Sequence, residues 1–129
     1  MKISLWILAV FLLALSFILA ACNEPPGGNL AKINEVEVVA EPGNSPRYVA
    51  VASGILPDGC TRLGRAGQRV AATTIKVTLP TQSAEDTCGQ LATVPFRERI
   101  PLQVKGLSAG SYTVDINGVV ASFVLAEDH

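Results

Sequence analysis

The feature of this sequence that most constrains its fold is a two-residue alternation of apolar and polar side chains from residue 35 onward. Successive side chains of a β-strand point to opposite faces of a sheet, so this period predicts strands with one buried face. Asn117-Gly118 stands between two such runs, 112–116 and 119–125. A type I′ turn needs a positive φ at both central residues, which Asn and Gly tolerate, so the pair predicts a hairpin.

The alternating runs are short, and clusters of turn-forming residues separate them. The expected strands are 35–41, 47–56, 69–79, 93–99, 112–116 and 119–125, with 100–104 continuing the alternation after 93–99. Strand 47–56 is apolar on both faces, which is typical of a central strand, whereas Pro95 restricts 93–99 to a sheet edge. No segment shows a convincing helical period. The pattern predicts an all-β domain, a sandwich of about seven strands.

The residues Leu107, Gly110 and Tyr112, just before the terminal hairpin, resemble the tyrosine corner of immunoglobulin-like and fibronectin type III-like domains. This resemblance implies a Greek-key order in which the last two strands pair and the Tyr hydroxyl bonds back to the connecting backbone. The Trp of an antibody-type core is absent, because Trp6 is the sole Trp and lies in the N-terminal apolar segment. The pattern as a whole also resembles small uncharacterised bacterial lipoproteins, a resemblance that implies no activity.

The N-terminus has the layout of a secretory signal peptide. Lys2 precedes the nearly continuous apolar run 3–18, which is expected to be helical, and small residues follow it. Leu19-Ala20-Ala21-Cys22 resembles the lipobox of bacterial lipoproteins, which implies a diacylglyceryl group on the Cys22 sulfur and cleavage before Cys22. The alternative is an uncleaved membrane helix over 3–21, which just reaches spanning length. Both place the domain on the extracytoplasmic side, on the cell membrane or an outer membrane, and Asn23 is not the Asp that signals inner-membrane retention.

The segment after Cys22 is expected to be a flexible linker. Pro25-Pro26 and Gly27-Gly28 both block regular structure. A chain of this length would hold the domain about 20 Å from the membrane. The expected organisation is therefore a signal peptide over 1–21, a lipidated Cys and linker over 22–34, and a domain over 35–129.

The sequence contains three cysteines, an odd number that cannot all form disulfides within one chain. If Cys22 carries the lipid, Cys60 and Cys88 remain to form a disulfide, which an oxidising compartment permits. The alternative is three free thiols in a cytosolic protein. A catalytic thiol would need a base, and the only His is His129 at the end of the sequence.

No enzyme, metal or cofactor signature emerges. One His cannot complete a Ser-His-Asp set, and the widely spaced Cys pair lacks the His partners of a zinc site. Candidate calcium ligands form no recognisable loop; they are Asp58, Glu85, Asp86 and Asp115. We expect no catalytic residue, no metal and no cofactor.

Two polar loops, 57–68 and 81–90, are the candidate binding loops. Arg62, Arg65 and Arg69 are spaced so that they could bind a carboxylate, a phosphate or anionic lipid headgroups, although a solvated loop is the plainer explanation of them, and Asp58 lies beside them. The formal net charge of −1 excludes a strongly basic nucleic-acid-binding surface.

The expected function is therefore a non-catalytic module that binds a protein or an envelope polymer and is held on a membrane through Cys22. Two alternatives remain open at this stage. One is an inhibitor or chaperone of an exported enzyme such as a protease. The other is a structural spacer of the envelope.

Overall fold

A computed structural model describes residues 29–84 and 87–129, and over these ranges the chain is all-β, with nine strands in three sheets. The expected signal peptide, Cys22 and most of the expected linker lie outside the described residues. Within the described ranges there is no helix of sufficient length and apolarity to cross a membrane.

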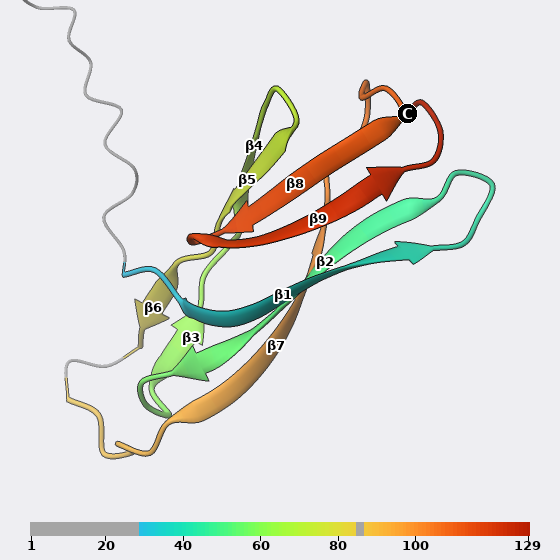
Figure 1. The fold of residues 1–129 in the computed structure, drawn as a ribbon. Helices are drawn as coiled ribbons and strands as arrows, with labels where there is room; N and C mark the ends of the chain where they lie inside the picture. The colour runs from blue at the N-terminus through green and yellow to red at the C-terminus, as the bar shows by residue number, and fades with distance from the viewer. Residues whose placement is uncertain (1–28, 85–86) are drawn as a thin grey trace, which may run out of the picture.

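The strands form two main sheets and one small ribbon (Figure 1). In chain order they are β1 (Lys32–Glu41), β2 (Arg47–Leu56), β3 (Thr61–Leu63), β4 (Gly67–Ala71), β5 (Thr74–Thr78), β6 (Thr81–Ser83), β7 (Val94–Pro101), β8 (Gly110–Ile116) and β9 (Val119–Leu125). The sheets have the orders β1-β2-β7, β4-β5-β8-β9 and β3-β6. The two main sheets pack face to face, and side chains from both form one core.

The three-stranded sheet confirms two expectations from the sequence. β2 is central and has the expected bounds, and β7, which contains Pro95, is at an edge, where a missing N–H is tolerated. Ala50 and Ala52 of β2 are fully buried in the core between the sheets.

The outer face of this sheet carries charged side chains that form ion pairs with one another. Arg97 and Arg99 of β7 form ion pairs with Glu37 and Glu41 of β1, across the intervening strand β2. Val51 of β2 is buried on this outer face, outside the main core cluster. The aliphatic parts of such long side chains can shield an apolar residue while their charged ends stay in water.

The four-stranded sheet ends in the hairpin expected around Asn117-Gly118. Asn117 has φ 51° and Gly118 has φ 94°, the two positive angles of a type I′ turn. β8 and β9 pair antiparallel, so the last two strands pair as expected. β8 also pairs with β5 in parallel, a pairing that the sequence pattern did not suggest.

The single strand expected over 69–79 is wrong. The segment is a hairpin in which β4 and β5 pair antiparallel, and its turn includes Ala72 at φ 53°. The alternation of Ile75, Val77 and Leu79 is real, and these side chains are buried in the core. The two expected polar loops are likewise shorter than predicted, because β3 and β6 form a ribbon within them.

The ordered domain begins before the expected boundary at residue 35. β1 starts at Lys32, and Leu30 forms a β-bridge with Pro80. Ala31 and Ile33 are buried in the core cluster. Their alternation with exposed neighbours continues the strand pattern into the segment that the sequence assigned to the linker.

Candidate functional site

The candidate binding loops lie at one end of the sandwich, together with the point where the chain enters the domain. We call this the loop end; it comprises residues 29–34, 54–66, 79–84 and 87–95. Lys32 at the start of β1 pairs with Ile55 at the end of β2, and the backbone N–H of Thr81 donates to the carbonyl oxygen of Asn29 at 2.7 Å. In Figure 1 this end is at the lower left, around β3, β6, the last residues of β2 and the first residues of β7.

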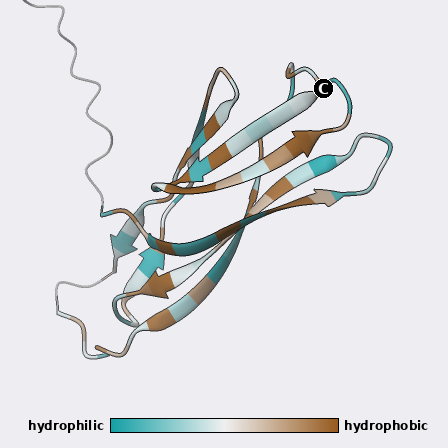
Figure 2. Cartoon of the chain, viewed as in Figure 1, coloured by the Kyte–Doolittle hydropathy of each residue, from teal (hydrophilic) through white to brown (hydrophobic). Residues whose placement is uncertain are grey.

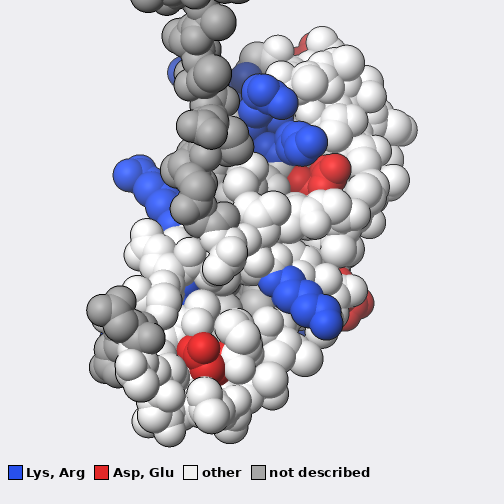
Figure 3. Space-filling model, turned by 90° about the vertical axis from the view of Figure 1, so that its left-hand side faces the viewer, with Lys and Arg blue, Asp and Glu red and all other residues white. Residues whose placement is uncertain are grey.

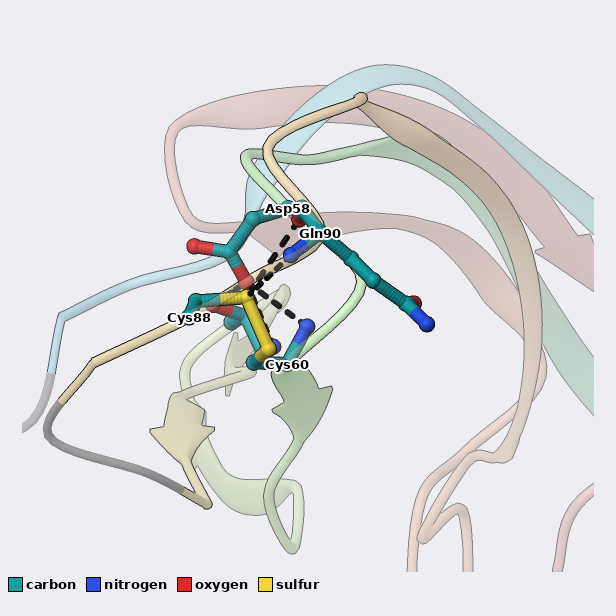
Figure 4. The surroundings of a disulfide bond; sticks show 5 residues. Asp58, Cys60, Cys88 and Gln90 are labelled. Atoms are coloured by element: carbon teal, nitrogen blue, oxygen red, sulfur yellow. Dashed lines mark hydrogen bonds between the residues drawn. A yellow bond between two sulfur atoms is a disulfide. The ribbon is translucent and has the colours of Figure 1, made fainter.

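Cys60 and Cys88 form a disulfide at the loop end, as the cysteine count predicted (Figure 4). Their Cα atoms are 5.8 Å apart, and the bond closes a sequence separation of 28 residues. Gly59 N–H also donates to the carbonyl oxygen of Gln90 at 2.9 Å. The bridge and this hydrogen bond join the loop after β2 to the loop before β7.

Asp58 stabilises the turn that leads into Cys60. One carboxylate oxygen accepts hydrogen bonds from the backbone N–H groups of Cys60 and Thr61, at 2.9 and 2.7 Å, and from the Thr61 hydroxyl at 2.8 Å. The Thr61 hydroxyl is the main cause that holds the pKa of Asp58 below its ordinary value of 3.8, and the two N–H groups act in the same direction. The Asp58 carboxylate therefore stabilises the loop that contains it, through these three hydrogen bonds.

Asp58 and the two cysteines bring three potential metal-ligand atoms within 4.8 Å of one another. Metal binding by cysteine requires the thiolate, and both sulfurs are used in the disulfide. In the oxidised protein these three residues therefore stabilise a turn, through the disulfide and the Asp58 hydrogen bonds, and do not form a metal site.

The structure does not bring the three candidate arginines into one cluster. Arg62 lies on β3 opposite Gln82, and Arg65 follows that strand. Arg69 lies on β4 opposite Lys76, which is itself beside Asp115 of β8. Figure 3 accordingly shows Lys and Arg side chains in separate groups with acidic groups near them, not as one continuous basic surface.

Two hollows open at the loop end. The larger has a volume of about 560 Å³, and its lining includes Leu30, Ile55 and Pro57. The smaller, of about 300 Å³, lies beside the disulfide and is lined in part by Cys60, Arg62 and Gln90. The first hollow thus has a mixed lining, in which Lys32 and several hydroxyl side chains lie beside the apolar ones, and Arg62 lies at the second.

The expected tyrosine corner lies toward the opposite end. The Tyr112 hydroxyl donates to the carbonyl oxygen of Ser108 at 2.8 Å, which fixes the connection into β8 between Leu107 and Gly110. His129 packs edge-on against the ring of Tyr48 with a centroid distance of 5.7 Å. The only histidine is therefore at the end of the domain away from the disulfide.

The side chain of Asn117 has a role that the sequence did not reveal. Besides forming the hairpin turn, it bonds to Ala31 and Leu79, which are far from it in sequence. The Asn-Gly signal identified the turn, but no pattern in the sequence identified these partners. Gln68 was missed in the same way; it bonds to the backbone of Pro101 and Gln103.

Residues 50–125 match the family model of the ORF11 beta-sandwich domain. The chain belongs to this family. The part that matches the ORF11 beta-sandwich domain runs from within β2 to the last residue of β9, so it includes the disulfide and both main sheets except β1. Comparisons with curated proteins and with solved structures give no match.

Proposed function

We propose that this ORF11 beta-sandwich domain is held on the extracytoplasmic side of a membrane by a lipid on Cys22 and works there as a non-catalytic binding module of the cell envelope. The observation that carries the proposal is the Cys60–Cys88 disulfide, because such bonds persist in oxidising compartments. With these two cysteines paired, Cys22 is the one remaining cysteine in the sequence. Its position at the end of an apolar segment is that of a lipidated residue.

The binding surface in this proposal is the loop end. The disulfide joins two loops that come from different strands, so they act as one preorganised surface. Loops on a rigid β-scaffold are common recognition surfaces. Arg62 and Arg65 supply exposed cations there.

We also propose that the fold is a variant of the immunoglobulin-like Greek key. The Tyr112–Ser108 hydrogen bond and the terminal β8–β9 hairpin support this relationship. The parallel β5–β8 pair is the feature that distinguishes this variant.

The anchor is tested by expressing wild-type protein and Cys22→Ser in bacteria with a labelled fatty acid. We expect label on the wild type and none on Cys22→Ser, which lacks the sulfur that would carry the lipid. Equal labelling of the two proteins would contradict the proposed anchor.

The binding surface is tested by crosslinking the intact protein on cells. The variant Arg62→Ala/Arg65→Ala should lower the yield of crosslinked product, whereas the control Arg47→Ala/Lys105→Ala, which alters exposed cations toward the other end, should not. An unchanged yield for the first variant would remove the loop end as the binding surface.

A further inference from the structure

The first described residue of the chain lies directly on the loop end. The carbonyl oxygen of Asn29 accepts hydrogen bonds from both the backbone N–H and the hydroxyl of Thr81, at 2.7 and 2.9 Å. Leu30 is bridged to Pro80. These contacts place Asn29 and Leu30 at the end of the domain that also carries the disulfide.

The length of chain before Asn29 limits how far this end can lie from an anchored Cys22. Residues 23–28 separate the two. A segment of this length spans at most about 25 Å when fully extended. With Cys22 anchored, Asn29 at the loop end stays within this distance of the membrane, whereas the turn between β1 and β2 is at the opposite end of the domain.

The loop end exposes apolar side chains. Four of the seven large hydrophobic residues that are exposed in the described chain belong to it, namely Leu30, Ile55, Leu91 and Val94. Leu91 is 79% exposed and Leu30 is 55% exposed. In Figure 2 the apolar colour is visible at the last residues of β2 and the first residues of β7.

The loop end carries cations that can meet anionic groups, although its loops also hold carboxylates. Its described residues include the cations Lys32, Arg62 and Arg65 and the carboxylate Asp58, and the sequence has Glu85 and Asp86 between its segments 79–84 and 87–95. Asp58 is turned toward its own loop, where three hydrogen bonds use its carboxylate oxygen. Arg62 and Arg65 are exposed at the same end as the exposed leucines. Exposed cations together with exposed apolar side chains are typical of proteins that lie on lipid surfaces.

We propose that the loop end rests on the phospholipid headgroup layer of the membrane that holds the anchor, with Leu91 and Leu30 inserted between headgroups and Arg62 and Arg65 at lipid phosphates. This inference rests on the proposed lipid anchor and names the partner of the proposed binding surface. The lipid phosphate accepts charge-assisted hydrogen bonds from Arg. The hollow between Tyr48 and Lys105, of about 730 Å³, then faces away from the membrane.

The proposal is tested with a tryptophan reporter in the full-length lipoprotein. The sequence has one Trp, Trp6. In a Trp6→Phe background, Leu91→Trp places the reporter at the loop end, and Val124→Trp places a matched reporter at an exposed β9 position toward the other end. Each protein is reconstituted into vesicles of phosphatidylcholine and phosphatidylglycerol that contain lipids brominated near the headgroup end of the acyl chains.

Bromine quenches Trp fluorescence only at short range, so we expect several-fold stronger quenching of Leu91→Trp than of Val124→Trp. Adding Arg62→Gln/Arg65→Gln should reduce the quenching of Leu91→Trp, whereas Lys105→Gln should not. Equal quenching at the two positions would overturn the proposal. A photoreactive residue at position 91 that crosslinks to a protein and not to lipid in native membranes would also overturn it, in favour of a protein interface.

Flotation of the same vesicles separates this inference from the proposed anchor. If the protein does not float with the vesicles, the anchor has failed. If it floats and Leu91→Trp is not quenched, the anchor stands and the membrane-resting loop end is wrong.

Discussion

Asn117 and Leu79 exchange two hydrogen bonds across 38 residues of sequence. The backbone N–H of Leu79 donates to Asn117 Oδ1 at 2.9 Å, and Asn117 Nδ2 donates to the Leu79 carbonyl oxygen at 2.8 Å. The same Nδ2 reaches the carbonyl oxygen of Ala31 at 2.9 Å. One side chain in a hairpin turn thus joins the end of β5 to the segment through which the chain enters the domain.

Replacing Asn117 should therefore destabilise the whole domain. Asn117→Ala removes three hydrogen bonds worth about 1 kcal/mol each and adds the cost of a positive φ, so we expect a loss of about 2–4 kcal/mol. Urea unfolding followed by circular dichroism measures it. Asn117→Gly is the control. Glycine tolerates a positive φ, so this variant should be about 1 kcal/mol more stable than Asn117→Ala. Equal stability of wild type and Asn117→Ala would show that the side-chain bonds contribute nothing.

The disulfide should stabilise the domain by restricting the unfolded chain. For a separation of 28 residues the chain-entropy estimate is about 3–4 kcal/mol. We expect Cys60→Ser/Cys88→Ser to lose about this amount in urea unfolding. Reductant should lower the urea concentration at the unfolding midpoint of the wild type. It should not change the midpoint of the double variant. A wild-type midpoint that does not respond to reductant would contradict the prediction.

Gly54 is required by the close approach of β1 and β7 to β2. A Cβ at this position would clash with the carbonyl oxygen of Lys32 and lie 2.6 Å from Phe96 Cζ. We expect Gly54→Ala to cost on the order of 1–3 kcal/mol in a thermal or urea denaturation series. Gly67→Ala, where a Cβ meets nothing within 4 Å, is the matched control. Similar losses in the two variants would argue against this packing constraint.

Asp58 should make part of the stability pH-dependent. Its pKa in the folded protein is below the ordinary value of 3.8, so its contribution is fully present above that value and is lost as the pH falls through the folded pKa. The difference in unfolding free energy between wild type and Asp58→Ala should be constant from pH 7 to about pH 5 and shrink below about pH 4. Glu35→Ala on β1 serves as the control. A difference that persists unchanged into acid would show that the carboxylate charge is irrelevant to the turn.

The sequence predicted elements whose signals are local. The bounds of β2, the Asn117-Gly118 hairpin and the edge position of Pro95 all follow from alternation or from backbone restrictions of single residues. The β4–β5 hairpin was missed because Ala72 and Thr73 are not turn-forming residues, and Ala at φ 53° is unusual. The start of β1 was missed because its short alternation directly follows a linker-like segment.

The disulfide at the candidate site was predictable from the sequence, but the position of the loops in the fold was not. Assigning Cys22 to the lipid left Cys60 and Cys88 to form the disulfide. The loops were identified by their polar, turn-forming composition. That these loops surround Asn29 depends on the Leu30–Pro80 bridge and on the β1–β2 register, which join residues far apart in sequence. Arg69 was grouped with Arg62 by spacing, whereas the strands place the two in different sheets.

The intact mass of the protein purified from bacterial membranes tests the central claim most directly. We predict a chain that begins at Cys22, carries the added mass of a diacylglyceryl group, and is two hydrogen atoms lighter than the reduced form because Cys60 and Cys88 are joined. A chain that retains Met1 with an unmodified Cys22, or one with free thiols at Cys60 and Cys88, would contradict the account.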